Sequence, residues 1–504
     1  MLSLCAFILF CMGLFVVRGN KFRLFGVIFA FIFLIVTLFN YSLLYFSGNF
    51  LTLSFINVII LSTKDAPLFT FWREILFICI FLVAIILFCI ILYDKTAKFN
   101  ANFDNLNKNS KIKFSLKINK FAPFICLFFA IFALILNPLT QSCIEIFQIL
   151  NPRYHKLARA NLQKLIIKPN LSEISKPKNI VYIYLESFSR DFTNKYPDLT
   201  PNLNALSNRL DFTNIEQIPF GAEVTIEGLF ASQCGLPFPF FHRLKAKNIK
   251  DDFGMHFPNQ LICVPEMLRE KNFHLSFIKG ADLAFQRTDE FLRSRKYDEM
   301  RGKSQLAMLG ATHFNEWGVD DDEMFNIAFA EFERLSQNNE KILQVVLNVG
   351  MHVPDGFVSQ KCQKMGLKYG DGKSKMLNSV LCTDYLVGEF VRKIRTSKWS
   401  KNTIIAIQND HLMPYGAANG IDKAKMTSKK MLFMILDDDI VGVQEIKKYG
   451  SSLDTFATLL GYMGVINGLN LGRNILKEES VNSTPNINFI YKTAIMSLDE
   501  LKYK

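Results

Sequence analysis

The N-terminal part of the chain consists largely of long apolar stretches separated by short polar segments. Each stretch has roughly 16 to 23 residues, and about 20 apolar residues are needed to cross a bilayer as a helix. The pattern predicts four transmembrane helices, at Leu2–Val17, Leu24–Phe46, Ile75–Tyr93 and Phe121–Leu136. A fifth stretch, Phe50–Leu61, is too short to span and is expected to lie in the membrane interface or to re-enter.

The cations between these stretches predict their orientation. Arg18, Lys21 and Arg23 follow the first stretch, whereas a cleaved signal peptide carries its positive charge before the apolar run. The segment Asp94–Lys120 holds seven lysines and two aspartates. Because cytoplasmic loops are enriched in Lys and Arg, both segments are expected on the cytoplasmic side. Four crossings from an outside N-terminus then place everything after Leu136 outside, as in a multi-pass inner-membrane protein with a periplasmic domain.

From residue 179 onward, short apolar runs alternate with helical patterns. The runs expected to be buried strands are Ile180–Leu185, Leu275–Ile278, Ile342–Val349, Thr403–Ile407 and Met431–Leu436. The expected helices are Pro201–Asn208, Val264–Lys271, Asp321–Leu335, Tyr385–Arg395 and Leu453–Met463. Strands separated by helices predict an α/β domain with a mostly parallel sheet covered on both faces. We therefore expect a transmembrane domain at 1–143, a juxtamembrane helix and linker at 144–178, and an outer domain at 179–504.

Net charge adds little to this picture. The 504 residues carry a formal charge of +13, and the two cytoplasmic segments account for most of it. A basic face for nucleic acid is therefore not indicated. The polybasic segment is expected near anionic lipid headgroups.

The ten cysteines divide between the two parts of the chain. Six lie in or near the apolar stretches, where cysteine behaves as a small hydrophobe. Four lie in the outer domain, where an oxidising compartment permits disulfides and four cysteines allow three pairings. The Lys- and Gly-rich segment between Cys362 and Cys382 is typical of a stapled loop, which favours the pairs Cys362–Cys382 and Cys234–Cys263. Four reduced thiols are the alternative.

Polar residues follow three of the expected strands directly. Glu186 follows the first strand, Asp410 and His411 follow the strand TIIAIQ, and His352 and Asp355 follow ILQVVLNVG. In such sheets, ligands bind beyond the carboxyl ends of the strands.

A hydroxyl joins these groups in the segment GAEVTIEGLFASQCGLP, where Thr225 precedes a helical run. A carboxylate, an Asp-His pair and a hydroxyl could together bind a divalent ion, which would lower the pKa of the hydroxyl. A helix N-terminus would add backbone donors for an anion. Taken singly, Glu186 could be a surface carboxylate and Thr225 a helix cap. The Asp-His pair could be a polar turn and His352 an ordinary loop histidine.

In series, these segments resemble the lipoteichoic-acid-synthase and phosphoglycerol-transferase branch of the sulfatase-like, alkaline-phosphatase superfamily. The similar blocks are LTPNLNAL, VTIEGLFASQCGLP, FPNQLIC, WGVDDDEMF, HVPDGF, NDHLM and LGRNIL, which lie within Asn179–Leu476. The resemblance implies a catalytic domain with an alkaline-phosphatase-like fold at 179–504.

The resemblance also implies roles for individual residues. By position, the metal-binding residues are Glu186, Thr225, Asp410 and His411, with Thr225 as the nucleophile. His352 matches a histidine that contacts the substrate phosphate, and the other residues assigned to the substrate pocket are Trp317, Asp320 and Asp355. The sequence departs from the family at Val353, where a second histidine is usual, and at MPYG after the Asp-His pair. Both departures lie near the expected acceptor site.

The implied function is a two-step transfer of phosphoglycerol from phosphatidylglycerol to a hydroxyl of a periplasmic glycan, with diacylglycerol as the leaving group. The ligand set suits Mn²⁺ or Mg²⁺, and Zn²⁺ remains open. A sulfatase activity is disfavoured, because Cys234 is followed by Gly235-Leu236-Pro237-Phe238 and not by the Cys-x-Pro-x-Arg segment that forms the aldehyde nucleophile. A phosphoethanolamine transferase acting on envelope glycan or lipid A is one alternative. A non-catalytic envelope scaffold or glycan-binding protein is another.

Overall fold

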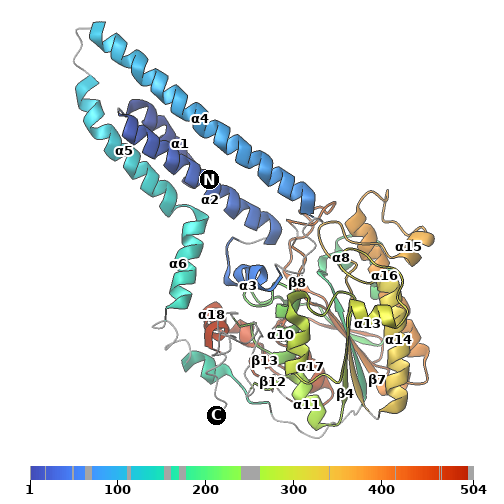
Figure 1. Cartoon of the computed structure of the whole chain (residues 1–504). Coiled ribbons are helices and arrows are strands. Elements are labelled where there is room, and N and C mark those ends of the chain that lie inside the picture. The colour runs from blue at the N-terminus through green and yellow to red at the C-terminus, as the bar shows by residue number, and fades with distance from the viewer. Residues whose placement is uncertain are drawn as a thin grey trace. The chain divides into compact units, whose positions relative to one another are not determined.

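The structure is a computed structural model. It describes residues 2–17, 19–47, 50–62, 71–109, 115–151, 160–169, 178–239, 261–339, 341–414, 416–464, 466 and 468–497. Contacts between Cα atoms divide the chain into two compact units. Unit 1 comprises residues 1–52 and 68–148, and unit 2 comprises residues 53–67 and 149–504. Figure 1 shows the elements of each unit.

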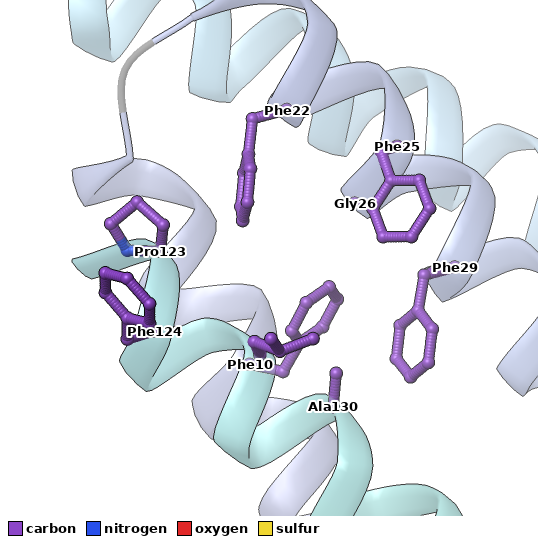
Figure 2. A pocket seen from close by; sticks show the side chains of 9 residues that line it. Phe10, Phe22, Phe25, Gly26, Phe29, Pro123, Phe124 and Ala130 are labelled. Carbon is purple, nitrogen blue, oxygen red and sulfur yellow. The ribbon is translucent and has the colours of Figure 1, made fainter. Parts of the chain in front are cut away.

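Unit 1 is built from apolar helices. Their bounds are α1 (Leu2–Val16), α2 (Asn20–Ser47), α4 (Trp72–Asn109), α5 (Ser115–Ile135) and α6 (Pro138–Leu150). An apolar pocket opens among α1, α2 and α5, walled largely by phenyl rings (Figure 2). The residues that line it are Phe10, Phe22, Phe25, Gly26, Phe29, Pro123, Phe124, Leu127 and Ala130.

The expectation of four transmembrane helices is wrong for the described residues. Among the helices of the described residues, α2 and α4 alone are long and apolar enough to span by themselves. The bent pair of α5 and α6 adds a third span if the two helices count as one. Helix α1 has 15 residues, which at about 1.5 Å per residue covers roughly 22 Å of a hydrocarbon core of about 30 Å. The fourth stretch ends at Ile135, and the chain bends by 59° before Pro138 starts α6. A proline at the start of a helix is favourable, whereas it cannot continue the helix before it.

The fifth apolar stretch forms α3 (Leu53–Ser62), which groups with unit 2. Asn57 of α3 is buried there and its amide donates to Glu227 Oε1 at 3.5 Å and to the Pro239 carbonyl at 3.4 Å. The juxtamembrane helix and linker expected at 144–178 lie partly outside the described residues, and residues 160–165 are helical.

Unit 2 is organised around an eight-stranded sheet in the order β10-β2-β9-β7-β1-β6-β4-β5. Among these strands, β9 alone runs against the others, since β7 and β2 both pair with it in antiparallel fashion. The fold is therefore α/β with a mostly parallel sheet, as the sequence predicts. The central strands are wholly buried, which explains their continuous apolar sequences. The bounds are β1 (Asn179–Leu185), β2 (Arg209–Phe212), β4 (His274–Lys279), β5 (Glu299–Arg301), β6 (Ile342–Leu347), β7 (Thr403–Asn409), β9 (Phe433–Leu436) and β10 (Val443–Ile446).

Small sheets complete the strand set of the described residues. β3 (Ile215–Glu216) pairs with β8 (Lys430–Met431) and β11 (Gly450–Ser451), and β12 (Gly468–Leu469) pairs with β13 (Gly472–Arg473).

Helices pack along the main sheet (Figure 1). Helix α14 contacts α16, β4 and β6, and α16 also contacts α9, whereas α10 contacts α17 and α11. The longer helices are α10 (Thr225–Cys234), α14 (Asp321–Asn338), α16 (Lys375–Thr396), α17 (Thr455–Tyr462) and α18 (Ile487–Ser497). The shorter helices are α8 (Asp191–Asn194), α9 (Pro201–Ala205), α11 (Val264–Glu270), η3 (Phe285–Arg287), α12 (Thr288–Ser294), α13 (Lys303–Met308), α15 (Gln360–Lys364), η4 (Ser400–Asn402) and η5 (Val481–Ser483).

Two disulfides cross-link unit 2. Cys234 at the end of α10 bonds to Cys263, the residue before α11, and Cys362 of α15 bonds to Cys382 of α16. These are the pairs that the sequence favours. The remaining six cysteines are free and all lie in unit 1.

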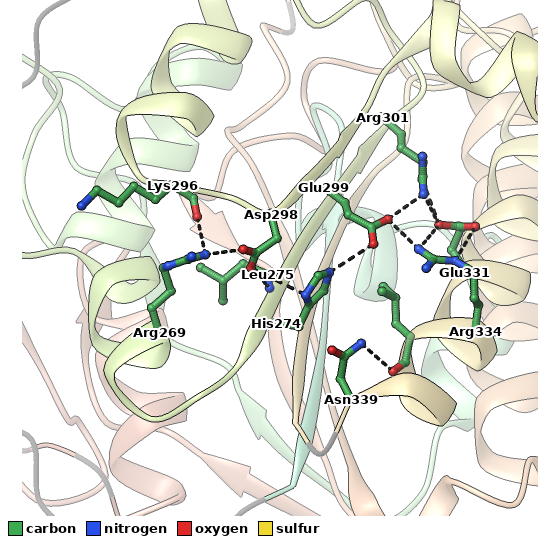
Figure 3. A network of polar contacts seen from close by, with 11 residues as sticks. Arg269, His274, Leu275, Lys296, Asp298, Glu299, Arg301, Glu331, Arg334 and Asn339 are labelled. Atoms are coloured by element: carbon green, nitrogen blue, oxygen red, sulfur yellow. Dashed lines mark hydrogen bonds and ion pairs between the residues drawn. The ribbon is translucent and has the colours of Figure 1, made fainter.

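A network of charged side chains covers the β5 edge of the sheet (Figure 3). Glu331 on α14 accepts hydrogen bonds from Arg301 at 2.6 Å and from Arg334 at 2.8 Å, and both arginines also reach Glu299. Charges on an edge strand discourage pairing with another chain. Burial would raise the pKa values of Glu299 and Glu331, but the two arginines outweigh it and lower both.

Glu331→Gln is expected to destabilise unit 2 by about 1–3 kcal/mol at neutral pH, since it removes charge-assisted hydrogen bonds. A carboxyl with a lowered folded-state pKa stabilises above its unfolded pKa, and this stabilisation fades as the pH falls through the folded-state value. The difference from the wild type should therefore shrink below about pH 4.5. Urea unfolding of the wild type and the variant, at neutral pH and below about pH 4.5, measures this difference in stability. Glu389→Gln is the control and should cost less, since Glu389 forms an ion pair with a single residue of the described part of the chain, Lys361. An equal loss of stability in the two variants at neutral pH would contradict the claim that the network around Glu331 stabilises unit 2.

Candidate metal-binding active site

The carboxyl ends of four neighbouring strands bring polar side chains to one edge of the sheet. β1 lies between β7 and β6 and runs parallel to both, and β4 follows β6. Glu186 follows β1, and Asp410 and His411 follow β7. His352 comes five residues after β6, and Lys279 is the last residue of β4. Since parallel strands end at the same edge, residues distant in sequence meet here.

Glu186, Asp410 and His411 form a compact cluster that could hold a metal ion. One ligand atom from each lies within 4.8 Å of the others, and all three residues are buried. His411 Nε2 lies 3.5 Å from Glu186 Oε1 and 3.5 Å from Asp410 Oδ2. Ligand atoms bound tetrahedrally at about 2.0–2.2 Å would be separated by a similar distance.

Hydrogen bonds orient Asp410 and His411 within the cluster. Asp410 Oδ1 accepts from the backbone N–H groups of Ser187 and His411, at 2.9 and 2.7 Å. Asp410 Oδ2 is buried and has no hydrogen-bond partner among the described residues. His411 Nδ1 lies 3.0 Å from the Leu412 carbonyl. Because a carbonyl only accepts, Nδ1 carries the proton, and neutral His411 presents Nε2 as a ligand.

Charge also favours a cation at this position. Burial and the charge of Glu186 raise the pKa of Asp410, because two adjacent buried carboxylates resist joint ionisation. Burial would lower the pKa of His411, but Asp410 and Glu186 raise it to about 10. A buried, unpaired carboxylate oxygen beside a second carboxylate and a histidine is a donor set that fits a divalent metal.

Thr225 is the first residue of α10 and its hydroxyl faces the cluster. Its Oγ1 donates to Glu186 Oε2 across 3.4 Å. The N-cap position belongs to Val224, and the N–H of Ile226 is satisfied at 2.9 Å by Gln286 Oε1. Thr225 therefore does not serve as the N-cap of α10, and its hydroxyl points to the side chain of a candidate ligand.

Gly228 allows α10 to approach the end of β7 closely. A Cβ at this position would lie 2.0 Å from the backbone oxygen of Asp410. The absence of a side chain at Gly228 therefore sets the distance between the helix that carries Thr225 and the strand that carries Asp410 and His411.

Trp317 packs on His352, whose ring interacts electrostatically with Glu186 and His411. Their rings stack, with centroids 3.4 Å apart and planes inclined by 21°. His352 Nδ1 lies 3.0 Å from the Val353 carbonyl, so it carries the proton and leaves Nε2 as an acceptor in the neutral ring. Burial lowers the pKa of His352 although Glu186 opposes the shift. Trp317 Nε1 is buried and has no hydrogen-bond partner among the described residues, which leaves a donor for a ligand.

The other two predicted pocket residues accept hydrogen bonds from residues outside the cluster. Asp320 accepts from Asn315 Nδ2 at 3.1 Å and from the N–H of Gln360 at 3.3 Å. Asp355 accepts from Asn419 Nδ2 at 2.9 Å. Neither belongs to the group of candidate metal ligands.

Lys279 is a site residue that the sequence reading missed. It is 2% exposed, and its Nζ donates to Thr288 Oγ1 at 2.9 Å. Burial lowers its pKa to about 8, although the charges of Glu186 and Asp410 oppose the shift. A lysine that closes the apolar run HLSFIK was the available signal, since lysine is almost never fully buried without a partner.

Comparison with known proteins assigns the family. The sequence profile of the sulfatase family matches residues 178–465, more than half of the chain. The chain belongs to the sulfatase family, and its fold is that of the alkaline phosphatase superfamily. A solved protein of that superfamily from Vibrio parahaemolyticus matches with a TM-score of 0.50 and 22% identity, over 65% of this chain and 79% of that one.

Curated relatives are similar in sequence over the same part. Phosphoglycerol transferase I of Salmonella choleraesuis (strain SC-B67) is 35% identical over 318 residues, which is 61% of this chain and 40% of that protein. Phosphoglycerol transferase I of Citrobacter koseri is 34% identical over 312 residues, 60% of this chain and 40% of that protein. The match thus spans less than half the length of these relatives.

Proposed function

We propose that this protein transfers phosphoglycerol from phosphatidylglycerol to a hydroxyl group of a periplasmic glycan, through a covalent intermediate on Thr225. The observation that carries the proposal is the Thr225 hydroxyl beside Glu186, Asp410 and His411 at the carboxyl edge of the sheet. The similarity to phosphoglycerol transferase I supports the choice of the group transferred.

Glu186, Asp410 and His411 would hold the divalent ion, with Thr225 as the fourth ligand and Mn²⁺ or Mg²⁺ favoured over Zn²⁺. When bound, the ion would lower the pKa of the Thr225 hydroxyl and neutralise charge on the phosphate oxygens.

In the first step, Thr225 Oγ1 forms a bond to the phosphorus of phosphatidylglycerol. The bond between phosphorus and the diacylglycerol oxygen breaks, and the hydroxyl proton of Thr225 ends on that oxygen. Lys279 and Trp317 Nε1 would meet the phosphate oxygens, since one brings a buried cation and the other a buried free donor.

In the second step, the acceptor hydroxyl attacks the phosphorus and the bond to Thr225 breaks. His352 Nε2, neutral because burial lowers the pKa of the ring, would take the proton of the acceptor and return it to the Thr225 oxygen. Splitting the transfer into two displacements replaces one difficult step by two easier ones.

The proposal places the protein in the inner membrane with its catalytic domain, residues 179–504, in the periplasm. Two disulfides in unit 2 support an oxidising compartment, whereas the free cysteines lie in unit 1. The apolar helices α2 and α4 support a membrane anchor, which would hold the catalytic domain near a lipid donor.

Purified full-length protein in Mn²⁺ is expected to release diacylglycerol from vesicles that contain phosphatidylglycerol and to label added periplasmic glycans with phosphoglycerol. Vesicles in which phosphatidylethanolamine is the only donor are the matched comparison. Mass spectrometry of the glycans reads out the group transferred. Transfer of phosphoethanolamine, with no phosphoglycerol, would replace this function by the phosphoethanolamine-transferase alternative, and transfer of neither group would favour the non-catalytic one.

A further inference from the structure

Asp321, in the first turn of α14, holds the segment that leads from β6 to His352. It is 2% exposed. Its Oδ1 accepts from the N–H of Val349 at 2.9 Å, and its Oδ2 accepts from Asn348 Nδ2 at 2.8 Å and from the N–H of Gly350 at 3.1 Å. Three successive residues after β6 are therefore tied to one carboxylate.

Gly350 is shaped to receive this carboxylate. A Cβ at Gly350 would lie 2.4 Å from Asp321 Oδ2, so a larger residue would push the carboxylate away from the segment. Charge-assisted hydrogen bonds from three donors make a buried carboxylate a firm anchor for backbone.

Asn348 extends the same hydrogen bonds to the metal cluster. It is wholly buried, and while its Nδ2 donates to Asp321, its Oδ1 accepts from the N–H of Glu186 at 2.8 Å. The segment of His352 and the residue that follows β1 thus share one chain of contacts, from Asp321 through Asn348 to Glu186.

The two neighbouring aspartates in WGVDDDEMF, Asp320 and Asp322, make different contacts. Asp320 accepts from the N–H of Gln360 and Asp322 from the N–H of Lys361, each at 3.3 Å, so both hold the start of α15. Of the three, Asp321 is connected by hydrogen bonds to the candidate active site.

We infer that Asp321 is a positioning residue that fixes Glu186 and His352 relative to each other, through Asn348 and the backbone of Val349 and Gly350. The inference rests on the proposed function, because it assigns Asp321 to the support of the same site. Groups that orient metal ligands from behind typically change metal affinity about 10- to 100-fold when they are lost.

The test compares Asp321→Asn with Asp384→Asn in the full-length protein. Asp384 is a matched control, since it is also wholly buried and accepts from two backbone N–H groups, of Asn202 and Leu203, and from one amide, Asn202 Nδ2. It anchors α9, which contains none of the candidate site residues. Both variants are expected to lose thermal stability. Only Asp321→Asn should bind Mn²⁺ about 10- to 100-fold more weakly and lose about 10²-fold in kcat, with a smaller change in KM.

Asn348→Ala provides a second variant in case Asp321→Asn does not fold. It leaves the bonds of Asp321 to Val349 and Gly350 in place and removes the connection to Glu186, so Mn²⁺ binding should again weaken. Wild-type Mn²⁺ affinity in either variant, or equal losses in Asp321→Asn and Asp384→Asn, would overturn the inference. If the wild type binds Mn²⁺ but releases no diacylglycerol, the proposed donor is wrong, and the Mn²⁺ affinities alone decide the role of Asp321.

Discussion

Thr225→Ala is expected to abolish diacylglycerol release while leaving the fold intact. The hydroxyl is one of four candidate ligands, but in the proposed mechanism it alone forms the bond to phosphorus. Removal of a nucleophile costs several orders of magnitude in rate. A helix cap, by comparison, contributes about 1 kcal/mol of stability, and the N-cap of α10 is Val224 in any case.

Thr455→Ala is the matched control for this change. Thr455 is also the first residue of a buried helix, α17, and its hydroxyl donates to the Ser452 carbonyl at 3.3 Å, away from the cluster. The rate of diacylglycerol release from labelled phosphatidylglycerol measures both variants, and Thr455→Ala should keep its activity. Release of diacylglycerol by Thr225→Ala at a rate near that of the wild type would refute the role of Thr225 as the nucleophile.

Gly228→Ala is expected to reduce activity strongly without touching any reacting group. The added Cβ would lie 2.0 Å from the backbone oxygen of Asp410, so α10 or the end of β7 must shift. Overpacking of this kind costs about 1–3 kcal/mol, offset in part by the gain of about 1 kcal/mol in helix propensity. A displacement of about 1 Å between Thr225 and Asp410 can lower the rate about 10²-fold.

Gly388→Ala separates lost stability from lost geometry. Gly388 lies within α16, so the change to Ala gains the same helix propensity. The added Cβ would meet Asn202 Cβ at 2.5 Å, and Asn202 is not one of the candidate site residues. Melting temperature and kcat are measured for both variants. Only Gly228→Ala should lose activity per folded molecule, and unchanged kcat in Gly228→Ala would show that the close approach has no role in catalysis.

The sequence predicted the sheet well where strands are central and poorly where they are at the edge. β1, β4, β6 and β7 are rich in apolar residues, because both faces of a central parallel strand are buried. The short strands β2, β5 and β10 of the main sheet were not predicted. β10 is largely exposed and lies at the edge, so its sequence VQEI carries no apolar signal.

Candidate site residues were found where they follow an apolar strand directly. Glu186, Asp410 and His411 have this signature, and the structure brings them together. Gln286 of η3 accepts a hydrogen bond from the N–H of Ile226, next to Thr225, and has a backbone φ of 53°. No local sequence pattern predicts this position. Asp321 stood between two other aspartates, and only tertiary contacts distinguish the three.

The count of membrane helices failed for a different reason. Composition measures how apolar a stretch is, whereas spanning also requires length and straightness. α1 is too short, and the last apolar stretch ends at Ile135, where a bend of 59° separates it from α6.

The most direct test of the account is to identify the residue that carries the covalent intermediate. Purified protein is mixed with phosphatidylglycerol labelled in its head group, without a glycan acceptor, and quenched within the first turnover. Mass spectrometry of the digested protein should find glycerophosphate on the peptide that contains Thr225, and none in Thr225→Ala. Release of diacylglycerol with Thr225 unmodified, or with the label on another residue, would contradict it.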